Sequence, residues 1–224
     1  MRKTRIIAIE GIDGSGKGTQ LVKLRETLIA RGMSVATKDF PRYGSFFGSE
    51  VGKLLSASDG VSANDVDGKS MALWYALDRF EAFSDYRDGE TDVLLLNRFV
   101  LSNAVYQSIR DIDLGKPDIV EWVFELEFEH FKLPKPDAIL FFDVEPHSAE
   151  RNVDKKGHRD YVGAGRDVYE ASDGIQQRAR AKYLECAGRY DNIIVIPCMK
   201  NGAMLGVDEI ADGAMAALKA RGII

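Results

Sequence analysis

Short apolar runs alternate along the chain with longer segments in which apolar and polar residues recur at helical spacing. The apolar runs are rich in Ile, Val, Leu and Phe and show little alternation, so each predicted strand is expected to be buried on both faces. Strands that alternate with helices are typical of an α/β fold, in which helices cover both faces of a parallel sheet. The predicted strands are residues 5–10, 34–40, 93–97, 138–143 and 193–197.

The segments between these strands predict helices, and Gly32 stands where a cap would end the first of them. These helices are residues 17–31, 62–87, 99–112, 119–131, 167–190 and 207–221. The segment 152–166 is polar, basic and glycine-containing, and we expect it to form a mobile loop or lid. No repeat, low-complexity tract or linker divides the sequence, so residues 1–224 are expected to form a single domain.

Composition narrows the possible functions. The chain has 224 residues, of which 45% are hydrophobic and 29% charged, as in an ordinary globular protein. No apolar stretch approaches the roughly 18 residues of a membrane span, and no signal peptide is recognisable, so no membrane association is expected. The net charge of −5 disfavours non-specific nucleic-acid binding. Cys186 and Cys198 lack zinc-ligand or disulfide-scaffold spacing, and a reducing cytoplasmic setting fits best.

A glycine-rich segment, Gly-Ile-Asp-Gly-Ser-Gly-Lys-Gly-Thr, follows the first predicted strand and matches the G-x-x-x-x-G-K part of a Walker A loop. Glycines let successive backbone N–H groups turn toward a triphosphate, and the next helix adds its positive N-terminal end. Lys17 supplies charge for the β and γ phosphates. A glycine-rich turn that binds nothing is disfavoured by the position between a strand and an amphipathic helix. The residues expected to bind ATP here are Gly11, Gly14, Ser15, Gly16, Lys17, Gly18 and Thr19.

Three later segments carry arginines and aromatic residues that could bind a phosphate acceptor: residues 39–43, 75–79 and 97–106. Arg42 and Arg98 can form forked, charge-assisted contacts to a phosphate, and Tyr43 can add a hydroxyl donor. Tyr75 and Arg79 are four residues apart in a predicted helix and therefore share a face. No Asn-Lys-x-Asp run is present to read guanine, so a regulatory GTPase is not expected.

Together with the loop, these segments resemble the thymidylate kinase family in order along the chain, from about Ile6 to Tyr190. The resemblance extends to Leu-Pro-Lys-Pro-Asp before the fourth predicted strand and to Asp-Val-Glu-Pro at its end. It implies a three-layer P-loop NTPase fold with a five-stranded parallel sheet and a short lid. It also implies transfer of the γ-phosphoryl group of ATP to dTMP with Mg²⁺, usually in a homodimer. The apolar faces of the helices at 62–87 and 99–112 are candidates for the dimer surface.

The resemblance further implies roles for single residues. Tyr75 matches the aromatic residue that stacks on thymine, and Arg79 matches the arginine at the edge of the base. Ser102, Asn103 and Tyr106 match residues that line the base and sugar. Without the resemblance, such residues would be read as core packing or as solvated and capping groups. The expected dTMP-binding residues are Asp13, Phe40, Pro41, Arg42, Tyr43, Tyr75, Arg79, Arg98, Ser102, Asn103, Tyr106 and Tyr169.

The sequence gives weaker signals for the acidic residues of the site and for the metal ion. Asp13 matches a position that contacts the acceptor sugar or organises a magnesium-bound water; otherwise it is a turn residue. Asp167, Tyr169 and Glu170 resemble the acidic-aromatic cluster that follows the lid in the family and lies near the acceptor. The family usually carries Asp-Arg-Tyr where this chain has Asn-Arg-Phe, and Gly18 replaces the usual hydroxyl ligand. Mg²⁺ is therefore expected to be held mainly by phosphates and water, with Asp13 as the candidate protein group.

The loop also lacks the arginine that some family members carry, because Gly14 and Ser15 stand there. Arg159 or Arg166 in the lid is therefore expected to stabilise the γ-phosphate, and Arg151 to bind adenine or phosphate. The groups expected to act in catalysis are Lys17, Arg98, Arg159, Arg166 and Asp13. Two alternatives stay open. One is a kinase for another nucleoside monophosphate or a deoxynucleoside, and the other is a nucleotide-binding protein without catalysis.

Overall fold

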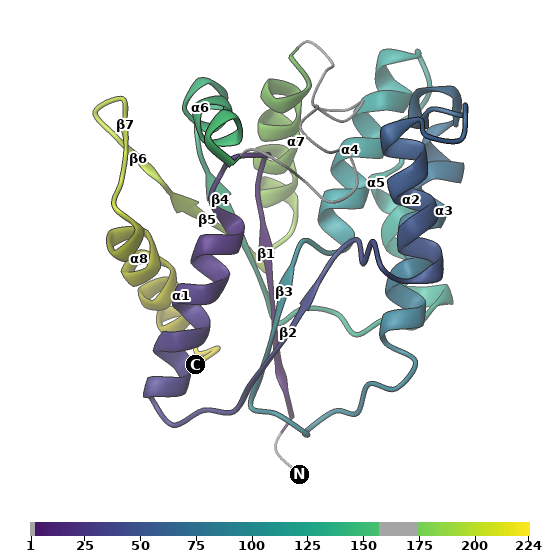
Figure 1. Cartoon of the computed structure of the whole chain (residues 1–224). Coiled ribbons are helices and arrows are strands. Elements are labelled where there is room, and N and C mark those ends of the chain that lie inside the picture. Colours follow the sequence, from purple (N-terminus) through teal and green to yellow (C-terminus); the bar gives the residue numbers. More distant parts are fainter. Residues whose placement is uncertain (1–2, 157–173) are drawn as a thin grey trace.

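The structure is a computed structural model that describes residues 3–156 and 174–224. Figure 1 shows a central sheet with helices on both of its faces. Its strands are β1 (Arg5–Glu10), β2 (Val35–Asp39), β3 (Val93–Asn97), β4 (Ala138–Asp143) and β5 (Ile193–Pro197), and a separate hairpin pairs β6 (Met199–Lys200) with β7 (Ala203–Met204). The helices are α1 (Lys17–Ala30), α2 (Phe46–Ser56), η1 (Ala63–Asp65), α3 (Gly68–Ala82), α4 (Val100–Asp113), α5 (Val120–Phe124), η2 (Glu125–His130), α6 (Pro146–Lys156), α7 (Ile175–Arg189) and α8 (Val207–Ala220).

The five long strands pair in the order β2-β3-β1-β4-β5, and every pairing is parallel. This confirms the predicted α/β class and the five-stranded parallel sheet. The central strands β1, β3 and β4 are buried almost throughout. Burial on both faces is wrong for β2, which is half-buried or exposed along its length because it has a neighbour on one side only.

The helices form two groups. In Figure 1, α1 and α8 pack together on one side of the sheet, while α4 packs against α3, α5 and α7 on the other. Residues 100–111 of α4 are all buried, so this helix is core and not the dimer surface that its apolar face suggested. None of the helices in the described part of the chain combines the length and the apolar character that a membrane crossing requires.

The single helix predicted for residues 62–87 is wrong, because two caps divide it. Ser62 and Asp65 form a capping box around the 3₁₀ turn η1, and Asp67 then caps α3 by accepting a hydrogen bond from the Ser70 N–H (3.1 Å). The helix predicted for 119–131 is also divided, into α5 and the π-helix η2. In η2 the N–H of Phe131 binds the carbonyl of Leu126, five residues earlier (2.9 Å).

Three elements were not predicted. Helix α2 begins after Ser45, whose side chain accepts a hydrogen bond from the Gly48 N–H (3.1 Å). Its two internal glycines are poor helix formers, which hid it from the sequence pattern. Helix α6 continues to Lys156, so the expected loop at 152–166 begins as helix. The β6–β7 hairpin has strands of only two residues.

Candidate active site

The phosphate loop connects β1 to α1 and has the backbone that its glycines predict. Gly11, Gly14 and Gly16 all have positive φ, of 153°, 80° and 83°. A β-carbon on Gly11 would lie 2.6 Å from the Ser15 Oγ and 3.0 Å from a backbone oxygen of β4, so only glycine fits. Gly16 carries no side chain that could cap α1, so the first N–H groups of the helix face the loop.

Lys17 is buried at the start of α1, and its Nζ donates to the carbonyl oxygens of Gly11 (2.9 Å) and Ile12 (2.7 Å). The ammonium group is therefore folded back over the loop. A β-carbon on Gly18 would meet no atom within 4 Å, so the lack of a hydroxyl there is not imposed by crowding.

Two elements that sequence reasoning missed border the phosphate loop. Asn152 of α6 donates from Nδ2 to the Gly14 carbonyl oxygen (3.0 Å) and approaches the sulfur of Met204 in β7 (3.4 Å). A β-carbon on Gly16 would lie 3.6 Å from the Met204 methyl group. Arg151, expected near adenine or phosphate, is exposed, and its Nη2 donates to Ser148 Oγ within α6 (3.3 Å).

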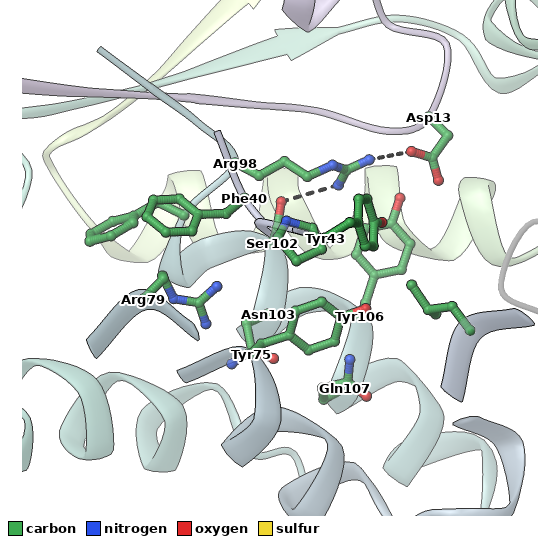
Figure 2. Close-up of a pocket in the computed structure, with 13 residues that line it drawn as sticks. Asp13, Phe40, Tyr43, Tyr75, Arg79, Arg98, Ser102, Asn103, Tyr106 and Gln107 are labelled. Atoms are coloured by element: carbon green, nitrogen blue, oxygen red, sulfur yellow. Dashed lines mark hydrogen bonds and ion pairs between the residues drawn. The ribbon is translucent and has the colours of Figure 1, made fainter. Parts of the chain in front are cut away.

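A pocket opens beside the loop, and most of the predicted acceptor residues line it (Figure 2). They come from the loop, from the segment after β2, from α3, from the β3–α4 junction and from α4 itself. Leu55, Phe99 and Gln107 also line it and were not predicted. The predicted residues that line the pocket are Asp13, Phe40, Pro41, Tyr43, Tyr75, Arg79, Arg98, Ser102, Asn103 and Tyr106.

Arg98 projects from the junction of β3 and α4 toward the phosphate loop. Its backbone has a positive φ of 59°, and its N–H donates to the Ile9 carbonyl oxygen (2.9 Å). The guanidinium forms an ion pair with Asp13, donates to Ser102 Oγ (3.3 Å) and lies over the Tyr106 ring, as Figure 2 shows. Burial opposes the charge of Arg98, but Asp13, Tyr106, Tyr183 and Glu10 together outweigh it and hold the pKa of Arg98 well above its usual value.

A buried carboxylate fixes the segment that carries Arg98. Glu10, the last residue of β1, is fully buried and accepts hydrogen bonds from the N–H groups of Phe99 (2.8 Å) and Ser102 (3.2 Å). Its second oxygen accepts from the Ser102 hydroxyl and from Tyr183 Oη in α7 (3.2 Å). Burial raises the pKa of Glu10, while the Ser102 hydroxyl and the charge of Arg98 lower it. Glu10 thus caps α4 from the neighbouring strand.

Arg42 is not where the sequence predicted it. It does not line the pocket, because Asp78 of α3 holds it. The buried Asp78 carboxylate accepts from Arg42 Nε (3.0 Å), from the Arg42 backbone N–H (2.8 Å) and from Ser45 Oγ (2.8 Å). Glu81 forms a second ion pair with the same guanidinium. A buried carboxylate needs such partners, and Arg42 supplies the positive charge.

At the other end of the pocket, Arg79 of α3 and Asn103 of α4 meet Glu127 of η2. Arg79 and Glu127 are 2% and 0% exposed, and the guanidinium donates from Nε (2.5 Å) and Nη2 (2.6 Å) to the two carboxylate oxygens. Asn103 donates from Nδ2 to Glu127 (3.0 Å) and to the Ala72 carbonyl oxygen (3.0 Å). Its Oδ1 is buried and has no hydrogen-bond partner among the described residues.

Helix α7 also reaches the pocket. Gln176 accepts from the Asp13 N–H and from Tyr106 Oη (both 3.0 Å) and donates from Nε2 to the Asp13 carboxylate (3.0 Å). Gln176, Glu10, Glu127 and Tyr183 were missed from the sequence, where no motif separates them from ordinary helix and strand residues. The expected lid and acceptor residues Arg159, Arg166, Asp167, Tyr169 and Glu170 lie outside the described residues.

Comparisons with known proteins agree with this geometry. The family model described as thymidylate kinase matches residues 9–203. The chain is 37% identical over 187 residues to a thymidylate kinase of Mycobacterium tuberculosis, covering 82% of this chain and 86% of that protein. It is 29% identical to a probable thymidylate kinase of Methanocaldococcus jannaschii, covering 95% of both. The structure of a thymidylate kinase from Candida albicans superposes with a TM-score of 0.75 at 19% identity, covering 99% of this chain and 93% of that one, and supports the fold.

Proposed function

The chain belongs to the thymidylate kinase family, and we propose that the pocket beside the phosphate loop holds dTMP while it receives the γ-phosphoryl group of ATP. The reaction is ATP-dependent phosphorylation of dTMP to dTDP. An oxygen of the dTMP phosphate attacks the γ-phosphorus, and the bond to the departing ADP breaks. The convergence of Arg98, Asn103 and the loop residue Asp13 on one pocket carries the assignment of the acceptor site.

The base end of the pocket favours thymine. Both Nδ2 hydrogens of Asn103 are occupied, by Ala72 and Glu127, so its amide presents Oδ1 as an acceptor. Thymine has an N–H at N3, which would satisfy this oxygen, whereas cytosine has a second acceptor there. Arg79 lines the same end, where its guanidinium can donate to a base carbonyl, and the ring of Tyr75 can stack on the base.

The phosphate end of the pocket is the one near Asp13, where Arg98 lies. An acceptor phosphate would take over part of the charge-assisted bonding that Asp13 now gives to this guanidinium. The Tyr43 hydroxyl is a further donor on the pocket wall. Because Asp78 holds both Arg42 and Ser45, Arg42 supports the segment that carries Tyr43.

On the donor side, the N–H groups of the loop and the Lys17 ammonium would neutralise the phosphates of ATP. The proposal that Arg159 or Arg166 stabilises the transferring phosphoryl group rests on the lack of an arginine in the loop. Replacing each by alanine tests it. A turnover number that both variants retain would contradict a catalytic role for the lid arginines.

Mg²⁺ is proposed as the partner of ATP, held mainly by phosphates and water. Within residues 3–156 and 174–224, no three Asp, Glu, His or Cys side chains cluster as a metal site, and Asp13 is already paired with Arg98. The buried Oδ1 of Asn97 has no hydrogen-bond partner among the described residues. This oxygen could therefore accept a hydrogen bond from a metal-bound water. The charge supplied by Mg²⁺ when bound would add to that of Lys17 in neutralising the phosphates.

Gly18 allows the metal proposal to be tested without an activity assay. In Gly18→Ser the new side chain has open space, and its hydroxyl stands at the usual metal-ligand position of the loop. We expect Mg²⁺ to strengthen ATP binding more in this variant than in Gly18→Ala, as measured by titration calorimetry with and without Mg²⁺. An equal effect of Mg²⁺ in both variants would contradict a metal at this position.

One substrate panel tests the reaction. ADP formation is measured with ATP and Mg²⁺ over dTMP, dUMP, dCMP, dAMP, dGMP and thymidine. We expect the highest kcat/KM with dTMP and little turnover of dCMP. Faster turnover of thymidine than of dTMP would indicate a deoxynucleoside kinase, and no turnover with any acceptor would indicate a binding protein without catalysis.

We infer a homodimer in the cytoplasm, as the family resemblance implies. Apolar side chains on α2 and α3 support a dimer surface: Phe46, Leu73 and Phe80 are 66%, 40% and 48% exposed. Leu73 and Phe80 are seven residues apart and so share one face of α3. Sedimentation should show a dimer that Phe80→Asp dissociates, while Val22→Asp on the distant helix α1 leaves it intact. A monomeric wild-type protein would contradict the inference.

A further inference from the structure

Within residues 3–156 and 174–224, Glu127 is the carboxylate that contacts both Arg79 and Asn103 at the base end of the pocket. It lies in the π-helix η2 and is fully buried, whereas Glu125 and Glu129 on either side of it have side chains that are 65% and 55% exposed. Of these three glutamates only Glu127 faces inward, toward α3 and α4.

Among the described residues, the groups that contact the Glu127 carboxylate are all hydrogen-bond donors. Arg79 supplies Nε–H and Nη2–H, and Asn103 supplies Nδ2–H. Two carboxylate oxygens can accept all three bonds, whereas a glutamine would place its own NH₂ against at least one of these donors. The ionised side chain of Glu127 is therefore the group that this arrangement requires.

The contact with Glu127 decides how the Asn103 amide is turned. The two ends of an amide are nearly equal in shape but opposite in hydrogen bonding. With Nδ2 bound to Glu127 and Ala72, Oδ1 is the atom left without a partner among the described residues. If the amide turned over, an NH₂ group would take that place and would suit the N3 acceptor of cytosine.

We propose that Glu127 is a positioning residue that sets the preference for thymine over cytosine, by holding the Asn103 amide oxygen and the Arg79 guanidinium toward the base. This inference rests on the proposed acceptor site. Sites that hydrogen-bond a substrate N–H reject analogues that lack it by large factors, because the buried protein group is left unpaired. Glu127 acts through Asn103 and Arg79 and does not itself line the pocket.

The test compares Glu127→Gln with Glu125→Gln, the same substitution on the exposed face of the same turn. The ratio of kcat/KM for dTMP to that for dCMP is measured at saturating ATP, together with the KM for ATP. We expect Glu125→Gln to keep the wild-type ratio and Glu127→Gln to lower it by at least about tenfold, through a higher KM for dTMP and a lower KM for dCMP. The KM for ATP should stay unchanged.

A merely structural role would lower turnover of both acceptors together and leave their ratio intact, and that result would overturn the proposal. Glu127→Asp keeps the negative charge on a side chain that is shorter by one carbon. It replaces Glu127→Gln if circular dichroism shows that Glu127→Gln does not fold. An unchanged dTMP to dCMP ratio in Glu127→Asp would likewise overturn the proposal. A wild-type enzyme that uses dTMP and dCMP equally would also overturn it. A wild-type protein that does not phosphorylate dTMP would instead refute the proposed function.

Discussion

Replacing Glu10 tests whether the acceptor site is organised by a buried carboxylate. In Glu10→Ala the N–H groups of Phe99 and Ser102 lose their acceptor inside the core. Each buried, unsatisfied donor costs about 1–3 kcal/mol, so with two of them the variant should lose about 2–6 kcal/mol of unfolding free energy. That is a large part of the roughly 5–15 kcal/mol that stabilises a domain of this kind. In Glu10→Gln one oxygen remains for both N–H groups, and the hydroxyls of Ser102 and Tyr183 can rotate to accept from the new NH₂ group.

Glu10→Gln should therefore destabilise the protein less than Glu10→Ala does. It should also change how the free energy of unfolding depends on pH. Burial raises the pKa of Glu10 above its usual 4.5, so the folded protein holds this proton more tightly than the unfolded chain does. Its contribution to stability is fully present below pH 4.5 and is lost as the pH rises through the raised pKa. Glutamine does not titrate. As the pH rises from 4.5 to the raised pKa of Glu10, we expect the free energy of unfolding of wild type to fall relative to that of Glu10→Gln. The fall should be up to about 1.4 kcal/mol per pH unit.

The measurement is urea unfolding from pH 4 to 8, followed by circular dichroism and by the fluorescence of the two tryptophans. Glu26→Gln, on the exposed surface of α1, is the matched control and should show neither effect. A loss below about 1 kcal/mol in Glu10→Ala would refute the hydrogen-bond argument. A difference between wild type and Glu10→Gln that does not change with pH would refute the raised pKa.

Other features lead to further predictions. Arg98→Lys keeps the charge but loses the forked geometry, and should lower kcat/KM for dTMP by about 10²-fold with little change in the KM for ATP; equal losses for both substrates would contradict a role confined to the acceptor. Burial raises the pKa of Cys186 to about 11 and that of Cys198 to about 12, so neither thiol should be alkylated by iodoacetamide at pH 8 until the protein is unfolded, which mass spectrometry detects. Gly213 is exposed in α8 with no atom within 4 Å of an added β-carbon, so Gly213→Ala should raise the free energy of unfolding by about 0.5–1 kcal/mol in urea, and a loss would contradict that open environment.

The sequence pattern predicted the strands of the sheet well. The bounds of β1, β3, β4 and β5 match the predicted strands, because each is a short run dominated by Ile, Val, Leu or Phe. The phosphate loop was recognisable because its glycines are required by positive φ values within a few consecutive residues. Most acceptor residues were found through a family resemblance and then converge on one pocket.

What the sequence did not reveal depends on contacts between distant segments. Glu10 and Glu127 look like ordinary polar residues at the end of a strand and on a helix, yet both are fully buried because donors from other elements surround them. Arg42 was assigned to the phosphate because a forked cation suits it, but Asp78, 36 residues along the chain, holds its side chain. Residue type indicates what a side chain can bind, and only the tertiary structure decides between competing partners.

The π-helix η2 has a consequence for comparing this chain with its relatives. A π turn is an α-helical turn that contains one additional residue. Deleting one residue between 125 and 130 would restore regular winding, and each side chain of that turn that moves by one position would change direction by about 100°. The inward direction of Glu127 is therefore tied to chain length as well as to residue type. In an alignment, a one-residue gap at this turn would identify relatives that lack the π turn, either because the extra residue was never inserted or because it was later lost.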